Sequence, residues 1–269
     1  MDVFIKAVFL GIIEGITEFL PISSTGHLII ANHFFEFTGD FANMFDVVIQ
    51  LGAILSVVVY FWSRLNPLAL LQAGVERDRT WMLWKKAVVG VLPALVIGGL
   101  LGDKVEELLF NPTVVAWALV LGGLLLWWME NRDRAAKIES VEHMSYNIAL
   151  LIGLVQCLAM IPGTSRSAAT IIGAMLLGLS RASAAEYSFF LAIPTMAAAS
   201  AYTLLKSNFQ LSVLEWQLLL VGFVVSFLVA WAVIALFMNY IRKNDFKPFA
   251  YYRVILGIVL LVLIGQKVL

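Results

Sequence analysis

Glu14-Gly-Ile-Thr-Glu18-Phe-Leu-Pro-Ile-Ser-Ser-Thr-Gly-His27 combines two carboxylates, a run of hydroxyl side chains and a histidine inside sequence that is otherwise strongly apolar. A charged side chain at bilayer depth costs about 2.5–3.5 kcal/mol even on the most lenient insertion scales. Such a cluster persists in a membrane segment only if it faces a cavity and serves a function. The stretch therefore predicts a functional site inside a membrane protein.

The composition of the whole chain supports this class. Of its 269 residues 61% are hydrophobic and 13% are charged, and the mean hydropathy is +0.92, whereas soluble domains carry about 25% charged residues. Lys+Arg and Asp+Glu are balanced at 18 each, and no basic block is interleaved with aromatic residues, so nucleic acid is not an expected partner. Cys157 is the only cysteine, which excludes an internal disulfide. We expect one all-α polytopic membrane domain over residues 1–269.

The apolar segments are of two kinds. Six are long enough to span a bilayer, which takes about 20 mostly apolar residues, and they lie at 46–62, 85–102, 113–129, 184–206, 214–240 and 249–268. Two others, 3–36 and 147–178, are broken near the middle by Pro21-Ile-Ser-Ser-Thr-Gly and Pro162-Gly-Thr-Ser-Arg-Ser. Non-helical backbone at membrane depth occurs only where it is buried in protein or lines a water-filled cavity. Both broken segments are predicted to form re-entrant helix–loop–helix hairpins.

The two halves of the chain, approximately 1–130 and 147–269, repeat the same order of one hairpin and three spans. Gly11-Ile-Ile-Glu14 parallels Gly153-Leu-Val-Gln156, and Pro21-Ile-Ser-Ser24 parallels Pro162-Gly-Thr-Ser165. Asp46 and Leu51 similarly parallel Glu186 and Leu191, at a register of about 140 residues. Because each half has an odd number of spans, the second half is expected to be inverted. The pattern predicts an inverted-topology repeat with its site at the midplane.

Basic residues predict the orientation. If the loop 63–84 is cytoplasmic, the cytoplasmic flanks hold Arg64, Arg77, Arg79, Lys85, Lys86, Arg132, Arg134, Lys137, Arg181, Arg242, Lys243 and Lys247. Only Lys6, Lys104, Lys206 and Lys267 then lie outside, as the positive-inside rule requires. Both termini are predicted to be outside. Aromatic residues at span ends, including Trp127, Trp128, Tyr251 and Tyr252, fit an interfacial belt.

Glu14 and Glu18 lie four residues apart on the first predicted helix and therefore share one face. Two carboxylates this close in a low-dielectric cavity repel each other. Either one of them holds a proton, or a cation such as Mg²⁺, Ca²⁺ or an arginine compensates both. Glu14 and Glu18 are thus candidate metal ligands.

The loop of the first hairpin has the features of an anion site. Pro21 is predicted to end the incoming helix, and a new helix is expected near His27. A helix N-terminus with free N–H groups binds phosphate readily, and the hydroxyls and small residues are supplied by Ser23, Ser24, Thr25 and Gly26. His27 follows Ser24 by three residues, which allows a hydroxyl–imidazole contact or separate contacts with one ligand. His33 and His143 are expected to be structural.

Arg166 is the expected partner in the second hairpin. It lies between Thr164, Ser165 and Ser167, where a helix running to Leu179 is predicted to begin. A guanidinium at this depth requires an oxyanion or a carboxylate, and its fork geometry suits phosphate. A purely structural bridge to Glu14 or Glu18 is the alternative. If the two loops meet, the combined site can bind phosphate, activate a nucleophile and compensate developing charge.

The first motif and Pro162-Gly-Thr-Ser-Arg-Ser-Ala-Ala-Thr170 resemble the two signature motifs of the bacterial undecaprenyl-pyrophosphate phosphatases, the bacitracin-resistance protein family. The resemblance extends over the whole chain, including Phe45-Asp-Val-Val-Ile-Gln-Leu-Gly52. One departure is Ala168, where the family pattern usually has glycine after Ser-Arg-Ser.

The resemblance implies hydrolysis of undecaprenyl diphosphate to undecaprenyl phosphate and phosphate, which recycles the lipid carrier of cell-wall synthesis. It implies a multi-pass protein of the bacterial plasma (inner) membrane whose cavity opens to the periplasmic side, with a polyprenyl diphosphate as partner; a homodimer is compatible with the sequence. The implied catalytic residues are Glu14, Glu18, Ser24, His27 and Arg166. The phosphate-binding set is Ser23, Thr25, Gly26, Thr164, Ser165 and Ser167, and a divalent cation, Mg²⁺ or Ca²⁺, would be held by Glu14 and Glu18.

Several mechanisms fit these residues. The nucleophile is Ser24 activated by His27 or Glu18, His27 itself, or water activated by a carboxylate. Alanine at Glu18, His27 or Arg166 is expected to abolish turnover. A secondary transporter or a flippase of a phosphate-bearing lipid is the rival class, since inverted repeats with broken helices are typical of transporters.

Overall fold

The computed structural model describes residues 2–66, 74–132, 135–206 and 211–268, and its regular structure within these ranges is helical, apart from one isolated bridge between Ile138 and Leu179. Arg134, one of the predicted cytoplasmic cations, lies outside the described residues. The predicted all-α class is confirmed.

Six helices are long and apolar enough to cross a membrane, and they coincide with the six predicted spans to within several residues. They are α3 (Asp40–Tyr60), α5 (Val75–Leu109), α6 (Pro112–Glu130), α9 (Arg181–Lys206), α10 (Val213–Ile241) and α11 (Lys247–Gly265). The largest difference is in α5, which begins ten residues before the predicted span. The prediction began too late because the first turns of this helix carry several charged side chains. Hydropathy detects the apolar part of a helix and misses such a polar extension.

The remaining helices are short and come in two pairs. The first pair is α1 (Val3–Thr17) and α2 (Ser24–Phe35), and the second is α7 (Tyr146–Gln156), continued by the turn η3 (Cys157–Met160), with α8 (Arg166–Leu176). A short helix α4 (Trp62–Leu65) follows α3, and a turn η2 (Val141–His143) precedes α7.

Three predicted boundaries are wrong. Helix α1 ends at Thr17 and not at Pro21, since the chain leaves the helix before the proline. Helix α2 begins at Ser24 and not near His27, because the Ser23 hydroxyl accepts a hydrogen bond from the Gly26 N–H (3.4 Å) and caps the helix earlier. Helix α8 ends at Leu176, where Gly178 follows with a φ of 104°, a conformation that favours glycine.

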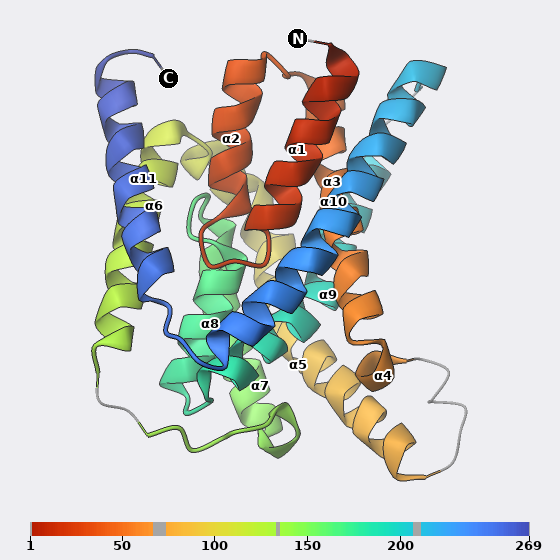
Figure 1. The fold of residues 1–269 in the computed structure, drawn as a ribbon, viewed down its shortest axis with the longest axis vertical. Coiled ribbons are helices and arrows are strands. Elements are labelled where there is room, and N and C mark those ends of the chain that lie inside the picture. The colour runs from red at the N-terminus through yellow and green to blue at the C-terminus, as the bar shows by residue number, and fades with distance from the viewer. Residues whose placement is uncertain (1, 67–73, 133–134, 207–210, 269) are drawn as a thin grey trace.

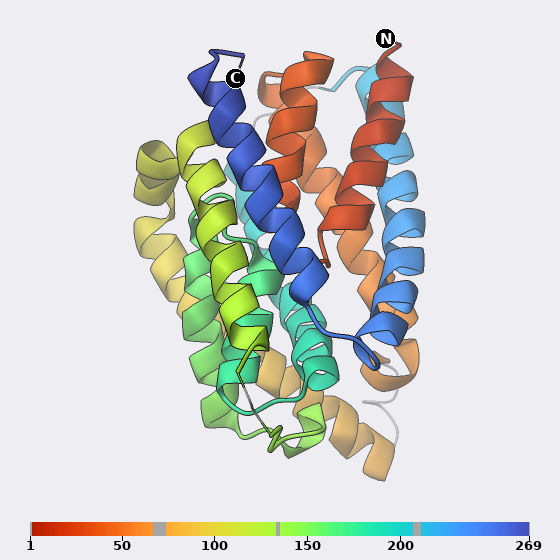
Figure 2. The ribbon, with the colours of Figure 1, turned by 60° about the vertical axis from the view of Figure 1, so that its left-hand side comes forward.

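The two pairs approach each other from opposite ends of the bundle. In Figure 1 the loop between α1 and α2 and the loop before α8 lie near mid-height, while the N- and C-termini lie at one end. Figure 2 shows α6 beside α11 and α10 beside α1, pairs that also make extensive contacts. The long helices thus enclose both loops.

Glycines allow the short helices to approach the long ones closely. A Cβ atom on Gly11 would lie 2.8 Å from the Gly222 carbonyl oxygen, and one on Gly153 would lie 2.0 Å from the Gly90 carbonyl oxygen. Small residues at such crossings are the usual means of tight packing between membrane helices. The contact of Gly11 in α1 with α10 and that of Gly153 in α7 with α5 therefore fix the position of each following loop within the bundle.

An ion-pair cluster closes the end of the bundle away from the termini. Arg64 pairs with both Glu142 and Glu186, and Lys86 donates to the Val141 and Glu142 carbonyl oxygens at 2.9 and 2.7 Å. Burial acts to raise the pKa of the Glu142 carboxyl, but the hydrogen bond from Ser140 and the charge of Arg64 together bring this pKa below its usual value. Glu142 therefore stays charged and ties η2 to α4.

Candidate active site

Both loops contribute to one polar cavity of about 130 Å³. Its wall includes Glu18 and Ser23 from the first loop with Ser24 and Thr25 from the start of α2, and Pro162, Gly163 and Ser165 from the second loop with Arg166 from the start of α8. The structure therefore brings together residues that are about 140 positions apart in the chain, as the sequence predicted. The cavity is a suitable candidate for the active site.

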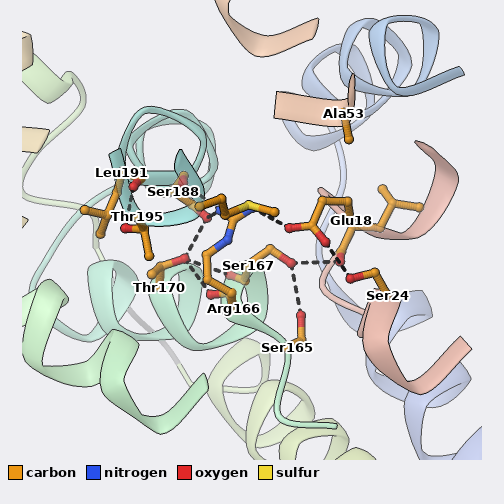
Figure 3. A network of polar contacts seen from close by, with 12 residues as sticks. Glu18, Ser24, Ala53, Ser165, Arg166, Ser167, Thr170, Ser188, Leu191 and Thr195 are labelled. Atoms are coloured by element: carbon orange, nitrogen blue, oxygen red, sulfur yellow. Dashed lines mark hydrogen bonds and ion pairs between the residues drawn. The ribbon is translucent and has the colours of Figure 1, made fainter. Parts of the chain in front are cut away.

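Glu18 is the centre of the polar contacts between the loops (Figure 3). Its Oε2 accepts a hydrogen bond of 2.5 Å from the Ser24 hydroxyl, and its Oε1 accepts one of 3.0 Å from Arg166 Nη2. The carboxylate is 6% exposed, so water screens this pair weakly. A serine hydroxyl that donates to a buried carboxylate has its proton acceptor already in place.

Arg166 is held from its other side by α9. Its Nη1 donates to the Ser188 carbonyl oxygen at 2.9 Å, and the Ser188 hydroxyl is bonded to Thr170 at 2.6 Å (Figure 3). Its Nε is buried and has no hydrogen-bond partner within the described chain. The guanidinium is thus positioned at the cavity wall with one donor unused.

The two helices that begin at the cavity are capped in the same way. Ser23 before α2 and Ser165 before α8 have φ angles of 74° and 71°, which are rare for residues other than glycine. Their hydroxyls accept from the Gly26 and Ala168 N–H groups at 3.4 and 3.2 Å. Strained non-glycine backbone of this kind is concentrated at functional sites. Two helix N-termini therefore converge on one cavity, an arrangement that favours an anion.

Three of the predicted phosphate-binding residues, Gly26, Thr164 and Ser167, lie outside the cavity wall. The Ser167 hydroxyl donates to the Leu20 carbonyl oxygen at 2.8 Å and so connects the two loops. Thr164 accepts a hydrogen bond through its carbonyl oxygen, and Gly26 binds the Ser23 cap. Ala168 is 1% exposed and also lies outside the cavity wall, so its methyl group does not obstruct the cavity.

Glu14 lies one turn before Glu18 and is completely buried. Neither of its carboxylate oxygens has a hydrogen-bond partner among the described residues, and the same holds for Asp46 Oδ1 and Asn32 Oδ1. Buried acceptor oxygens without donors require a proton, a water molecule or a cation. Glu14 thus retains the capacity to bind a proton or a cation next to Glu18.

His27 is not part of the cavity wall. Its Nδ1 contacts the Ser23 carbonyl oxygen at 2.7 Å, its Nε2 contacts the Tyr252 hydroxyl at 2.6 Å, and its ring stacks on the Tyr252 ring with centroids 5.6 Å apart. No contact with the Ser24 hydroxyl is made, although the spacing allowed one. His27 therefore connects the first loop to α11.

This geometry gives a prediction for His27. We expect His27→Gln to keep activity within about tenfold of wild type, because glutamine can still bond to the Ser23 carbonyl oxygen, whereas loss of a general base costs about 10²–10⁴-fold. The measurement is the rate of phosphate release as a function of pH. A loss of activity greater than about 10²-fold, together with the disappearance of one limb of the pH–rate profile, would show that His27 takes part in the chemical step.

Arg253 of α11 was missed as a site residue, although an arginine inside an apolar span is itself a signal of function. It is fully buried and donates to the Pro21 carbonyl oxygen at 3.3 Å and to the Gly163 and Thr164 carbonyl oxygens at 3.2 and 3.0 Å. It also donates to the Ala118 carbonyl oxygen of α6. One side chain therefore fixes both loops.

Removing this clamp is expected to reduce both stability and turnover. Arg253→Gln cannot reach both loops, and each orphaned carbonyl group costs about 1–3 kcal/mol. Thermal unfolding in detergent should shift downward by several degrees, and kcat should fall about 10²-fold as the loops separate. Arg79→Gln, on an exposed side chain of α5, is the control. Wild-type unfolding and turnover in the Arg253 variant would contradict the clamp.

Three residues of the cavity wall were also missed, Gln50, Ala159 and Met196. Gln50 of α3 and Met196 of α9 line the cavity, and Met196 Sδ lies 3.6 Å from Arg166 Nη2. Gln50 is a polar residue in a predicted span, which is a detectable signal. Met196 has no such signal, because methionine is ordinary in apolar helices.

Fold and site together define a polytopic helical membrane protein with a carboxylate–serine–arginine site suited to phosphate chemistry. The family model for the bacitracin resistance protein BacA matches residues 7–259, and the chain belongs to this family. It is 52% identical over 258 residues to undecaprenyl-diphosphatase 1 of Clostridioides difficile (strain 630), a match covering 95% of this chain and 94% of that protein. The undecaprenyl-diphosphatase of Caldanaerobacter subterraneus subsp. tengcongensis is 48% identical over 269 residues, covering 100% of this chain and 98% of that protein. That of Limosilactobacillus fermentum is 48% identical over 264 residues, with 96% of each chain covered.

Proposed function

We propose that the chain hydrolyses the terminal phosphoanhydride bond of undecaprenyl diphosphate and releases undecaprenyl phosphate and inorganic phosphate. Full-length similarity to proteins named undecaprenyl-diphosphatase supports the reaction. The observation that carries the chemistry is the 2.5 Å hydrogen bond from Ser24 to Glu18 beside Arg166. Phosphate release by the purified protein in detergent is the test, and transport of the lipid in liposomes without phosphate release would support the rival flippase.

Ser24 is the nucleophile in this proposal. Its hydroxyl oxygen attacks the terminal phosphorus while its proton passes to Glu18 Oε2, and the bond to the bridging oxygen breaks. Undecaprenyl phosphate leaves, and phosphate remains on Ser24 as an ester. Glu18 passes the proton it received to the departing undecaprenyl phosphate and is a carboxylate again. It then takes a proton from water as the water oxygen attacks the phosphoserine, and it returns this proton to the Ser24 oxygen as the phosphorus–oxygen bond to Ser24 breaks, which releases phosphate and restores the serine. In the first displacement the proton moves to a group already within hydrogen-bond distance of Ser24.

Arg166 stabilises the charge that develops on the phosphoryl oxygens. Its unused Nε donor and the Nη2 donor now bonded to Glu18 are both at the cavity wall. When Nη2 turns from Glu18 to the phosphate, it donates a charge-assisted hydrogen bond to a phosphoryl oxygen. The two capped helix N-termini add partial positive charge from both loops.

A divalent cation bound by Glu14 and Glu18 is a further part of the proposal. Carboxylate oxygens are suitable ligands for Mg²⁺ and Ca²⁺, and the unpartnered Glu14 oxygens are next to Glu18. No cluster of three His, Cys, Asp or Glu residues occurs in the ranges that the structure describes, so the diphosphate would supply the remaining ligands. When bound, the cation would neutralise phosphoryl charge.

The metal proposal has a direct test. We expect EDTA to lower the rate of phosphate release at least tenfold and Mg²⁺ or Ca²⁺ to restore it. Without a cation, the negatively charged diphosphate would be repelled by the two carboxylates. Glu14→Gln should raise the metal concentration needed for half-maximal rate. Full activity in excess EDTA would exclude a metal role for Glu14 and Glu18.

We further propose that the two short helix pairs are re-entrant hairpins of an inverted repeat. The capping serines Ser23 and Ser165 are 142 positions apart, as are Gly11 and Gly153. The same offset relates Phe45 and Ile49, which pack on Gly222, to Tyr187 and Leu191, which pack on Gly90. These pairs favour a register one residue different from the predicted match of Ser24 with Ser165.

The membrane orientation also belongs to this proposal. The positive-inside bias supports both termini outside and the cavity opening to the periplasmic side of the plasma membrane. The common position of the termini at one end of the bundle supports placing both on the same side of the membrane (Figure 1). A thiol-reactive probe that labels a terminal cysteine in intact cells is the measurement.

A further inference from the structure

We propose that a second cavity, at the end of the bundle away from the termini, binds the phosphate headgroup of an anionic phospholipid. This cavity encloses about 330 Å³ and is formed by the end of α6, the segment before η2, the end of α8, the start of α9 and the end of α10. It shares no wall residue with the site that contains Glu18 and Ser24. Nothing in the proposed hydrolysis uses it.

The wall of this cavity carries an excess of positive charge. Four cations, Arg132, Arg181, Arg242 and Lys243, face two carboxylates, Glu130 and Glu139. Glu130 is neutralised by Arg181, whose Nε lies 3.0 Å from both Glu130 carboxylate oxygens, and it also accepts from the Phe246 N–H at 3.1 Å. Three cations thus remain against Glu139, and none of the three forms an ion pair with any carboxylate that the structure describes.

Hydrogen-bond donors are also available there. Helix α9 begins at Arg181, and the N–H groups of Arg181 and Ala182, both wall residues, donate no hydrogen bond within the described ranges. Arg181 Nη1 has no partner there either. A helix N-terminus together with a guanidinium is well suited to phosphate oxygens.

Aromatic side chains indicate that the occupant is a lipid. The guanidinium of Arg132 lies 3.9 Å from the ring centroid of Trp128, and the neighbouring Trp127 donates to the Tyr251 hydroxyl at 3.3 Å. Trp127, Trp128 and Tyr251 are all exposed, and exposed Trp and Tyr at helix ends are typical of the headgroup level of a bilayer. A basic cavity between membrane helices at this level is a recognition site for anionic headgroups.

The test uses the full-length protein and lipid titrations followed by native mass spectrometry. Phosphatidylglycerol should bind to wild type, and the triple variant Arg132→Gln/Arg242→Gln/Lys243→Gln should bind it roughly 100-fold more weakly, at about fivefold per cation. The control Arg77→Gln/Arg79→Gln/Lys85→Gln removes three cations of α5 that do not line the cavity and should stay within about twofold of wild type. Thermal unfolding of each variant verifies the fold.

Four outcomes would overturn the proposal. Equal affinity of the cavity variant and wild type would exclude the site, and equal losses in both triple variants would indicate an unspecific basic surface. Displacement of the lipid by millimolar inorganic phosphate, or equal binding of phosphatidylcholine, would exclude an anionic lipid as the occupant. Selective loss for phosphatidylglycerol in the cavity variant alone is the expected result.

Discussion

Ser24→Ala is expected to lower kcat for undecaprenyl diphosphate hydrolysis by about 10³-fold or more, because it removes the only atom that forms the new bond to phosphorus in the first step. Substrate binding should be nearly unchanged, since the phosphate is held mainly by Arg166 and the two helix N-termini. The measurement is the rate of phosphate release under saturating lipid, with binding followed separately.

Ser56→Ala is the matched control for this substitution. Like Ser24, Ser56 is buried, but its hydroxyl donates to the Ala53 carbonyl oxygen within α3 and is not part of the cavity. We expect wild-type kcat in this variant. If Ser24→Ala retained more than about a tenth of wild-type activity, water would have to be the nucleophile, since His27 is directed to Tyr252.

Arg166→Lys is expected to lower kcat at least about 10²-fold even though the positive charge is kept. Arg166 uses Nη1 for the Ser188 carbonyl oxygen and Nη2 for Glu18, and an ammonium group cannot occupy both positions and also meet two phosphoryl oxygens. Arg166→Gln should lose about 10³-fold or more, in the range found for arginines that stabilise phosphoryl transfer. Rate against lipid concentration separates the effect on kcat from that on KM.

Arg181→Lys is a suitable control for the loss of a guanidinium. Arg181 also pairs with a buried glutamate, Glu130, but at the start of α9 and outside the proposed active site. Its replacement should change thermal stability and leave kcat within about threefold. If Arg166→Lys behaved in the same way, Arg166 would be a structural partner of Glu18 and not a participant in catalysis.

The spans and the joint site were predictable because their signals are local in the sequence. Runs of apolar residues define α3, α6 and α11. Burying a charged or hydroxyl residue within such a run costs free energy, so its presence there indicates a functional role. Glu18, Ser24 and Arg166 were singled out in this way as candidates, and the apparent repeat of the two halves predicted that the two loops meet, as they do at the cavity. Gln50 and Arg253 carry the same signal inside spans and were open to the same reasoning.

The orientation of individual side chains was not predictable. The spacing of Ser24 and His27 permits a contact on one helix face, but Tyr252 on α11 offers the imidazole a partner that no local rule indicates. The start of α2 similarly depends on the cap that Ser23 forms at a φ of 74°. The orientation of His27 arises from packing against a segment more than 200 residues away, and the start of α2 arises from strained backbone at Ser23. Neither feature leaves a periodic pattern in the sequence.

The stereochemical course at phosphorus tests the serine mechanism most directly. Undecaprenyl diphosphate with a chiral, isotopically labelled terminal thiophosphate would be hydrolysed in labelled water, and the configuration of the released thiophosphate determined. Attack by Ser24 followed by attack of water on the phosphoserine gives two in-line displacements and predicts retention of configuration. Inversion would show that water attacks the lipid directly, and it would contradict nucleophilic catalysis by Ser24.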